Sequence, residues 1–177
     1  TDQKTFLGEG QLAWLKEQLL SSTTPFKLVV SGSGWTKSKG EGGDSWAAFL
    51  NERNALFEFI RENEISGVVL LSGDTHTGEM NAIPWADKGG YDFYDLVSSP
   101  LATNPSQGWR TRAPEARLRP GFERKNLGLV SFEPGEDPTL TFNLYSEDGA
   151  AAWEPLVLKA SQLRNGVSSY QGNLKAD

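Results

Sequence analysis

Residues 67–76 read GVVLLSGDTH, and this stretch decides the fold class of the 177-residue chain. Its first half is a continuous apolar run, which is typical of a strand buried on both faces of a sheet. Polar residues follow directly where that run ends. Upstream, residues 8–21 and 45–63 carry apolar side chains at helical spacing, and residues 26–30 form another short apolar run. The order helix–strand–helix–strand predicts parallel strands joined by crossover helices.

Beyond residue 76 the pattern changes from helices to strands. Strands are expected at residues 93–98, 127–133, 140–145 and 152–158, the last of them at a sheet edge because it contains Pro155. The turn sequence PGEDP at residues 134–138 predicts a hairpin. Residues 100–125 are rich in Pro and Arg without periodicity, and the polar tail from residue 162 is expected to pack loosely. The two halves together predict a mixed α/β domain.

Composition limits the classes of function. A formal charge of −6 argues against nucleic acid as the main partner, because that role needs clustered Lys and Arg. Cysteine is absent, so thiolate nucleophiles and Cys-based zinc sites are excluded. His76 is the only histidine, so this chain cannot supply a pair of histidine ligands. No apolar run approaches the roughly 18–20 residues that a transmembrane helix needs.

Asp74 and His76 are the residues best placed for chemistry. They follow a predicted interior strand, and ligands of open α/β sheets bind beyond the carboxyl ends of strands. Carboxylate oxygen and imidazole nitrogen together suit hard and borderline metal ions. Gly73 would let the backbone turn sharply or approach an ion closely. The alternative is structural, with Asp74 capping a turn and His76 hydrogen-bonded within a loop.

Three other features have both a functional and a structural interpretation. Arg53 lies in the apolar stripe of the second helix, so it either forms a structural ion pair or orients a ligating carboxylate. The loop at residues 31–35 contains Trp35, and it either lines a metal site or is a plain flexible loop. An arginine cluster either attracts an anionic substrate or lies on a solvated loop, and its members are Arg110, Arg112, Arg117, Arg119 and Arg124.

Several segments, taken in order, resemble the PhoD-like branch of the metallophosphoesterases. The family's Leu-Gly-x-x-Gln-x-x-Trp-Leu helix is similar to residues 6–15, FLGEGQLAWL. Its Trp-then-Glu-Arg helix resembles Trp46 followed by Glu52 and Arg53, and its Ser-Gly-Asp-x-His segment resembles residues 72–76. The segments LVSSPL and NLG follow in the expected order, at residues 96–101 and 126–128.

This resemblance implies a fold, a chemistry and a set of site residues. The fold is a mixed two-sheet sandwich flanked by helices, the calcineurin-like metallophosphoesterase fold, with residues 1–177 as its C-terminal part, a core at about 5–160 and a polar tail at 161–177. The reaction is metal-dependent hydrolysis of phosphate mono- or diesters, in which the ions polarise the phosphoryl oxygens and generate hydroxide. Calcium and iron are the metals reported for the type member of the family. Asp74 and His76 are then predicted metal ligands, with Arg53, Trp35 and Gly73 supporting or lining the site.

The family's other ligands lie in upstream motifs, a Gly-Asp motif and a Trp-Asp-Asp-His-like stretch, that have no counterpart in this chain. We therefore expect a phosphoric ester hydrolase that needs an N-terminal half, from the same protein or from a separate chain. No general acid is assigned within residues 1–177. The resemblance also implies export, although the chain contains no signal peptide. The alternative function is a degenerate phosphoesterase half that acts as a binding or structural module.

Overall fold

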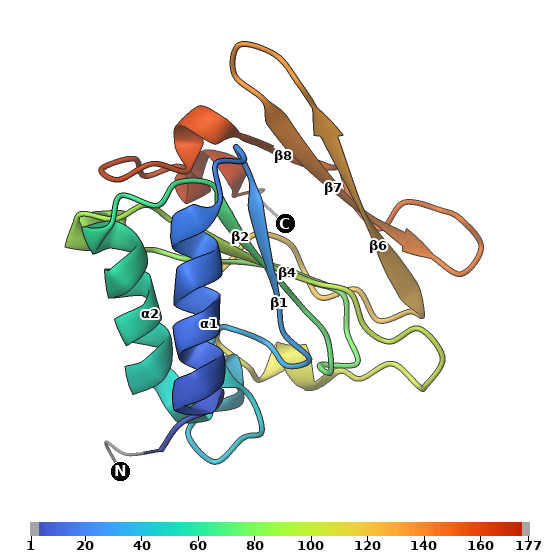
Figure 1. The fold of residues 1–177 in the computed structure, drawn as a ribbon. Coiled ribbons are helices and arrows are strands. Elements are labelled where there is room, and N and C mark those ends of the chain that lie inside the picture. The colour runs from blue at the N-terminus through green and yellow to red at the C-terminus, as the bar shows by residue number, and fades with distance from the viewer. Residues whose placement is uncertain (1–3, 175–177) are drawn as a thin grey trace.

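The computed structural model describes residues 4–174, which form three layers (Figure 1). Helices α1 (Gly8–Ser21) and α2 (Leu50–Glu62) lie side by side on one face of a five-stranded sheet, and a three-stranded sheet packs against the other face. The connections contain short 3-10 helices: η1 (Lys37–Lys39), η2 (Trp46–Phe49), η3 (Ala86–Lys88), η4 (Gly108–Arg110), η5 (Ala160–Gln162) and η6 (Tyr170–Asn173).

The five-stranded sheet has the order β1-β2-β4-β3-β5, which leaves β1 at an edge. Strands β1, β2 and β4 are parallel, and β3 runs antiparallel to its neighbours β4 and β5. The carboxyl ends of the three parallel strands therefore meet at one edge of the sheet. The strands are β1 (Lys27–Val30), β2 (Val68–Ser72), β3 (Glu79–Ile83), β4 (Phe93–Val97) and β5 (Ala116–Arg117).

The three-stranded sheet is an antiparallel meander of β6 (Asn126–Glu133), β7 (Thr139–Ser146) and β8 (Leu156–Lys159). Side chains of β7 alternate strictly between buried and half-buried positions, as expected for a strand with only one face against the core. Gly128 of β6 allows the sheet to pack closely, because a Cβ there would lie 2.7 Å from the ring of Phe142.

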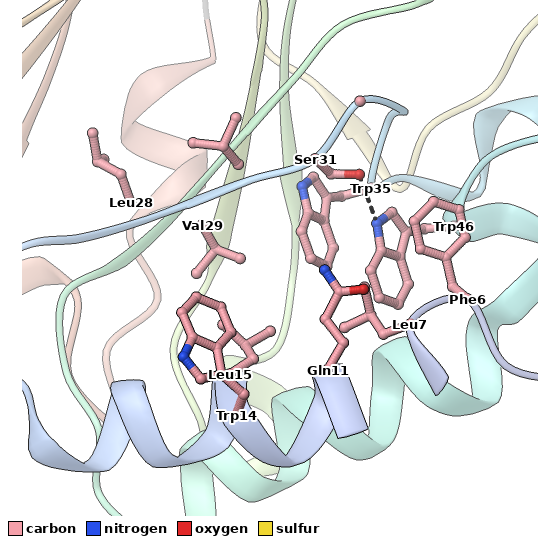
Figure 2. A pocket seen from close by; sticks show the side chains of 12 residues that line it. Phe6, Leu7, Gln11, Trp14, Leu15, Leu28, Val29, Ser31, Trp35 and Trp46 are labelled. Carbon is pink, nitrogen blue, oxygen red and sulfur yellow. Dashed lines mark hydrogen bonds between the residues drawn. The ribbon is translucent and has the colours of Figure 1, made fainter. Parts of the chain in front are cut away.

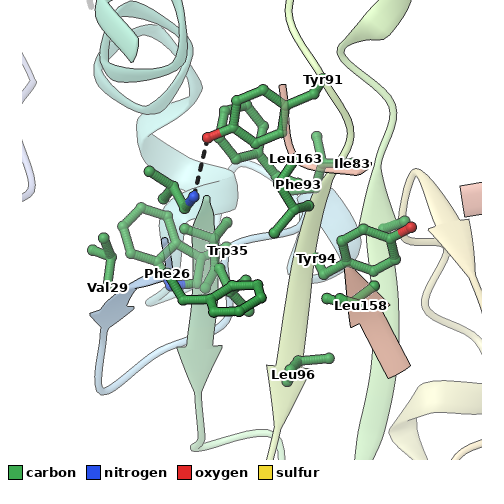
Figure 3. Packing of buried hydrophobic residues seen from close by; sticks show 14 of the residues in the cluster. Phe26, Val29, Trp35, Ile83, Tyr91, Phe93, Tyr94, Leu96, Leu158 and Leu163 are labelled. Atoms are coloured by element: carbon green, nitrogen blue, oxygen red, sulfur yellow. Dashed lines mark hydrogen bonds between the residues drawn. The ribbon is translucent and has the colours of Figure 1, made fainter. Parts of the chain in front are cut away.

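The core between α2 and the five-stranded sheet is built on aromatic rings (Figure 3). Phe57 of α2 stacks on Phe93 of β4 with ring centroids 4.0 Å apart. The Tyr91 hydroxyl accepts a hydrogen bond from the Val68 amide at 3.1 Å and donates one to the Ile65 carbonyl at 3.0 Å. Burial of this phenol raises its pKa well above the ordinary value, so it stays neutral and fixes the start of β2.

The predicted element order is largely confirmed. The helix expected at residues 8–21, the parallel arrangement of the first strands and the hairpin around residues 134–138 are all present. The helix expected from residue 45 begins as the 3-10 turn η2 before α2, with the Ser45 hydroxyl accepting a hydrogen bond from the Ala47 amide. Among the described residues the two α-helices cover one face only, so "flanked by helices" holds for one side of the sandwich.

Three predictions differ from the structure. Strand β3 lies outside the predicted strands because its polar residues Glu79 and Asn81 are buried, which masks the apolar pattern of an interior strand. Strand β5 is a two-residue strand inside the segment predicted to be irregular. The tail is not loosely packed over its described part, since Leu163 is fully buried and the Asp92 carboxylate accepts hydrogen bonds from the amides of Ser169 and Tyr170.

Candidate metal centre

The loop after β2 has an unusual backbone. Asp74 and His76 have φ angles of 67° and 54°, in the left-handed region that residues with a side chain rarely adopt. Hydrogen bonds hold the loop in this shape: the His76 amide donates to the Ser99 hydroxyl at 3.1 Å, and the Ser106 amide donates to the His76 carbonyl at 2.7 Å. Gly73 is not left-handed, so the sharp turn is made by Asp74 and His76 themselves. Such conformations cluster at functional sites, where surrounding contacts maintain them.

The side chains of Asp74 and His76 are both exposed at the end of β2. The Asp74 carboxylate accepts a hydrogen bond from the Lys39 ammonium, which also pairs with Asp44 at 2.8 Å. Burial of the ammonium opposes its charge, but these two carboxylates raise the pKa of Lys39 above the ordinary value. The His76 imidazole makes no hydrogen bond with any described residue, so its ring nitrogens are available to a ligand.

The donor types at this loop fit a metal ion, but their number does not complete a site. A carboxylate and an imidazole suit the same hard or borderline cations. Within residues 4–174, no group of three or more His, Asp or Glu side chains is arranged to hold a metal. Any ion held here therefore takes further ligands from water, substrate or another polypeptide segment.

Beneath the loop lies a buried polar cluster, formed by Trp35, Arg53, Ser72, Asp95 and Glu115. The fully buried Asp95 carboxylate accepts hydrogen bonds from the Ser72 hydroxyl at 2.6 Å and from the Trp35 amide at 2.9 Å. Burial raises the pKa of Asp95 to about 7. The cluster thus joins the end of β2, two residues before Asp74, to the loop that follows β1.

Arg53 supports this arrangement from α2. Its guanidinium donates to the Trp35 carbonyl at 2.7 Å and pairs with Glu115 at 2.8 Å, while only 4% of its side chain is exposed. Glu115 in turn accepts a hydrogen bond from the Lys37 amide at 3.1 Å. Arg53 makes no hydrogen bond or ion pair with Asp74 or His76, and its partner Glu115 contacts the 3-10 turn that carries Lys39.

Trp35 faces a different part of the molecule from the loop. Its ring is buried, stacks on Trp46 with centroids 4.3 Å apart, and lines an apolar groove of about 420 Å³ between α1 and the edge strand β1 (Figure 2). Trp14 of α1 also lines this groove and is 57% exposed. The Trp35 backbone, not its ring, contacts the polar cluster.

A sequence model of the family described as PhoD-like phosphatase matches residues 1–129. The chain belongs to this family. A curated relative, alkaline phosphatase D of Bacillus subtilis (strain 168), is 29% identical over 97 residues, which cover 51% of this chain and 16% of the relative. A solved structure titled "Structure of PhoD" matches with a TM-score of 0.60 at 17% identity, covering 98% of this chain and 38% of the solved one.

The PhoD-like chain therefore shares the mixed α/β, two-sheet fold of that solved structure while spanning well under half its length. The family match ends at residue 129, whereas the structural match covers 98% of the chain and therefore extends over the three-stranded sheet. No described helix is long and apolar enough to cross a membrane.

Several residues around the loop were not predicted as site residues. The sequence does contain an indication that Asp95 has buried partners. Asp95 is the only charged residue in the apolar strand FYDLV, and a carboxylate is costly to bury without partners. No sequence pattern indicates the roles of Lys39 and Glu115, because the contacts of Lys39 with Asp74 and of Glu115 with Arg53 join segments far apart in the sequence. Asp44 enters the site through its contact with Lys39.

Proposed function

We propose that this chain is part of a metal-dependent phosphoesterase in which Asp74 and His76 are metal ligands. The observation that carries the proposal is the left-handed loop, which presents an exposed carboxylate and an unpartnered imidazole at the carboxyl end of β2. Family membership makes a phosphate ester the expected substrate class. A metal bound here would supply Lewis acidity toward the phosphoryl oxygens.

Residues of this chain would hold and orient the ion's ligands. The hydrogen bonds from His76 to Ser99 and from Ser106 to His76 fix the backbone from which the imidazole projects, so the direction of the His76 side chain is set before any ion binds. The Asp95 cluster fixes Ser72 and thereby the point from which the loop leaves the sheet. Lys39 neutralises Asp74 and would have to move or share that carboxylate with the ion.

We propose that the remaining ligands come from a polypeptide segment outside this chain, an N-terminal half of the same protein or a separate one. Two features support this. The chain spans 38% of the solved PhoD structure that it matches. Strand β1 is an edge strand, its residue Val30 is 72% exposed, and the apolar groove runs beside it. Unpaired, apolar sheet edges are usually covered in native proteins.

The test is hydrolysis of p-nitrophenyl phosphate and bis-p-nitrophenyl phosphate by the chain together with an N-terminal half, with metal content measured in the same sample. Loss of both activity and metal in Asp74→Asn and His76→Ala is the expected result. Activity that survives both substitutions contradicts the assignment. Element analysis of the same sample would also show whether the ions present are calcium and iron, as the family resemblance implies. Fractionation of cells would test the export that the resemblance implies.

A second candidate function is a non-catalytic phosphoesterase half that binds or supports another chain. It is favoured by the Lys39 contact to Asp74 and by the lack of a three-donor group within the described residues. Metal-free protein in the presence of the N-terminal half would support this alternative.

A further inference from the structure

The five arginines of residues 100–125 differ in whether they have partners. Four are satisfied, by an acid or by main-chain carbonyls: Arg110 with Glu123, Arg117 with Glu79, Arg124 with Asp148, and Arg119 with the carbonyls of Leu118 and Asn173. The side chain of Arg112 makes no hydrogen bond to a described residue, and its Nη1 atom is buried.

An unpartnered buried guanidinium nitrogen requires an explanation. Buried polar groups in native proteins are nearly always hydrogen-bonded, and each exception points to strain, function or a missing ligand. Other described atoms of this kind belong to Glu79, Asn81 and Trp85, and none of them carries a positive charge. The planar fork of arginine is suited to carboxylate and phosphate groups. The missing acceptor at Arg112 is therefore best matched by an anion.

Residues on either side of Arg112 in the sequence make contacts that bring this segment toward the loop of Asp74 and His76. On one side, the Ser106 amide donates to the His76 carbonyl and the Thr77 hydroxyl donates to the Ser106 carbonyl, both at 2.7 Å. On the other side, Glu115 binds the Lys37 amide at 3.1 Å. Arg112 thus lies between a segment attached to His76 and a segment attached to the turn that carries Lys39.

The turn below Arg112 is shaped to hold its side chain. A Cβ at Gly108 would lie 2.9 Å from Arg112 Nη2 and 3.0 Å from its Cζ, so the guanidinium rests directly on the Gly108 backbone. The Gly108 amide is itself fixed by the Ser106 hydroxyl at 3.0 Å. The side chain is therefore positioned by the main chain rather than by an acidic partner.

The Asp44 carboxylate pairs with Lys39 at 2.8 Å and lies within electrostatic reach of Arg112. The hydrogen bond from Lys39 and, to a smaller extent, the charge of Arg112 lower the pKa of Asp44. The Asp44 side chain is 79% exposed, whereas that of Lys39 is only 12% exposed. An exposed carboxylate thus lies in the positive field of two cations that are more buried than it is, in a chain whose formal charge is −6.

We propose that Lys39 and Arg112 form an anion-binding pair that recognises the phosphate group of the ester, with the exposed Asp44 carboxylate as the group that the phosphate displaces. This inference rests on the proposed function for its choice of phosphate. The phosphate oxygens accept hydrogen bonds from the guanidinium and the ammonium. Lys39 contacts Asp74, so an anion held by Lys39 would lie next to the candidate metal ligands.

The test is titration of inorganic phosphate into the 177-residue chain, followed by nuclear magnetic resonance of its amides. Arg112→Gln is expected to weaken phosphate binding tenfold or more. The matched control is Arg110→Gln, two residues away and paired with Glu123, which is expected to change binding less than twofold. Equal phosphate affinity in the two variants, or no phosphate binding by the unsubstituted chain, overturns the proposal.

Two further measurements separate binding from folding. Arg112→Gln is expected to keep its thermal midpoint, because the Nη1 atom has no hydrogen bond to lose. Asp44→Asn is expected to bind phosphate several-fold more tightly, because it removes the competing charge. Weaker phosphate binding by Asp44→Asn contradicts the displacement.

The same samples distinguish this inference from the proposed function. Binding of Mn²⁺ at the loop is followed separately by broadening of the single histidine's ring signals. Phosphate binding without that broadening would support the proposed Lys39–Arg112 anion pair and contradict the proposal that Asp74 and His76 are metal ligands. Broadening without Arg112-dependent phosphate binding would retain the metal ligands and overturn only the anion pair.

Discussion

The buried polar cluster and the exposed loop of residues 73–76 lie next to each other at the end of β2, yet they satisfy their polar groups differently. In the cluster, Arg53 and Asp95 are almost fully buried and each has at least two partners. In the loop, His76 has no side-chain partner among the described residues and the backbone is left-handed. The difference indicates that the cluster stabilises the fold, whereas the loop leaves the His76 imidazole free for a ligand.

The largest effect should come from titrating Asp95 in the cluster. Its pKa is raised from 3.8 to about 7 in the folded state, so folding favours the protonated form. The stability that protonation contributes is present below about pH 4 and is lost as the pH rises through about 7. By linkage, this loss amounts to about 4 kcal/mol. Urea unfolding measured from pH 4 to 8 should show this loss of unfolding free energy in the unsubstituted chain and not in Asp95→Asn. Identical pH slopes in the two proteins would rule out Asp95 as the source.

Breaking the ion pair of the cluster should have the next largest effect. Arg53→Ala leaves Glu115 and the Trp35 carbonyl without their buried donor, which should lower the free energy of unfolding by about 3 kcal/mol. Arg61→Ala, on the same helix and paired with Glu58 at the surface, should lower it by less than about 1 kcal/mol. The two values come from denaturant unfolding at one pH. If the two variants lose the same amount, the contrast between cluster and surface is wrong.

The smallest effect on stability should come from the loop. At His76 the left-handed φ of 54° is easier for glycine than for alanine. His76→Gly should therefore be more stable than His76→Ala by about 1 kcal/mol. Both variants lack the imidazole, so thermal unfolding of this pair measures backbone strain apart from ligand binding. A more stable alanine variant would mean that the loop relaxes when the imidazole is removed.

The sequence predicted the exposed loop better than the cluster beneath it, for a physical reason. The position of Asp74 and His76 follows from the apolar run at residues 67–71, a local pattern that ends a buried strand. Two contacts of the cluster join residues 60 or more positions apart, Trp35 with Asp95 and Arg53 with Glu115. No local periodicity reports such pairs. Arg53 could be recognised as buried from the helical stripe, but its partners could not.

Strand β3 illustrates the same limit. The buried Glu79 carboxylate pairs with Arg117 of β5 at 3.1 Å and accepts a hydrogen bond from the Asn81 amide at 3.1 Å. The sequence alone does not bring β5 beside β3. Local patterns therefore predicted the helices and the apolar strands, whereas strands stabilised by distant polar partners were missed.

The most direct test of the exposed loop uses the fact that His76 is the only histidine. Its ring protons give one resolved set of signals in the proton spectrum of the chain, and Mn²⁺ broadens signals near the site where it binds. If Asp74 and His76 share an ion, these signals broaden on addition of Mn²⁺, and Asp74→Asn requires at least tenfold more metal for the same effect. Ring signals that stay sharp, or that broaden equally with and without the Asp74 carboxylate, would contradict a shared metal site.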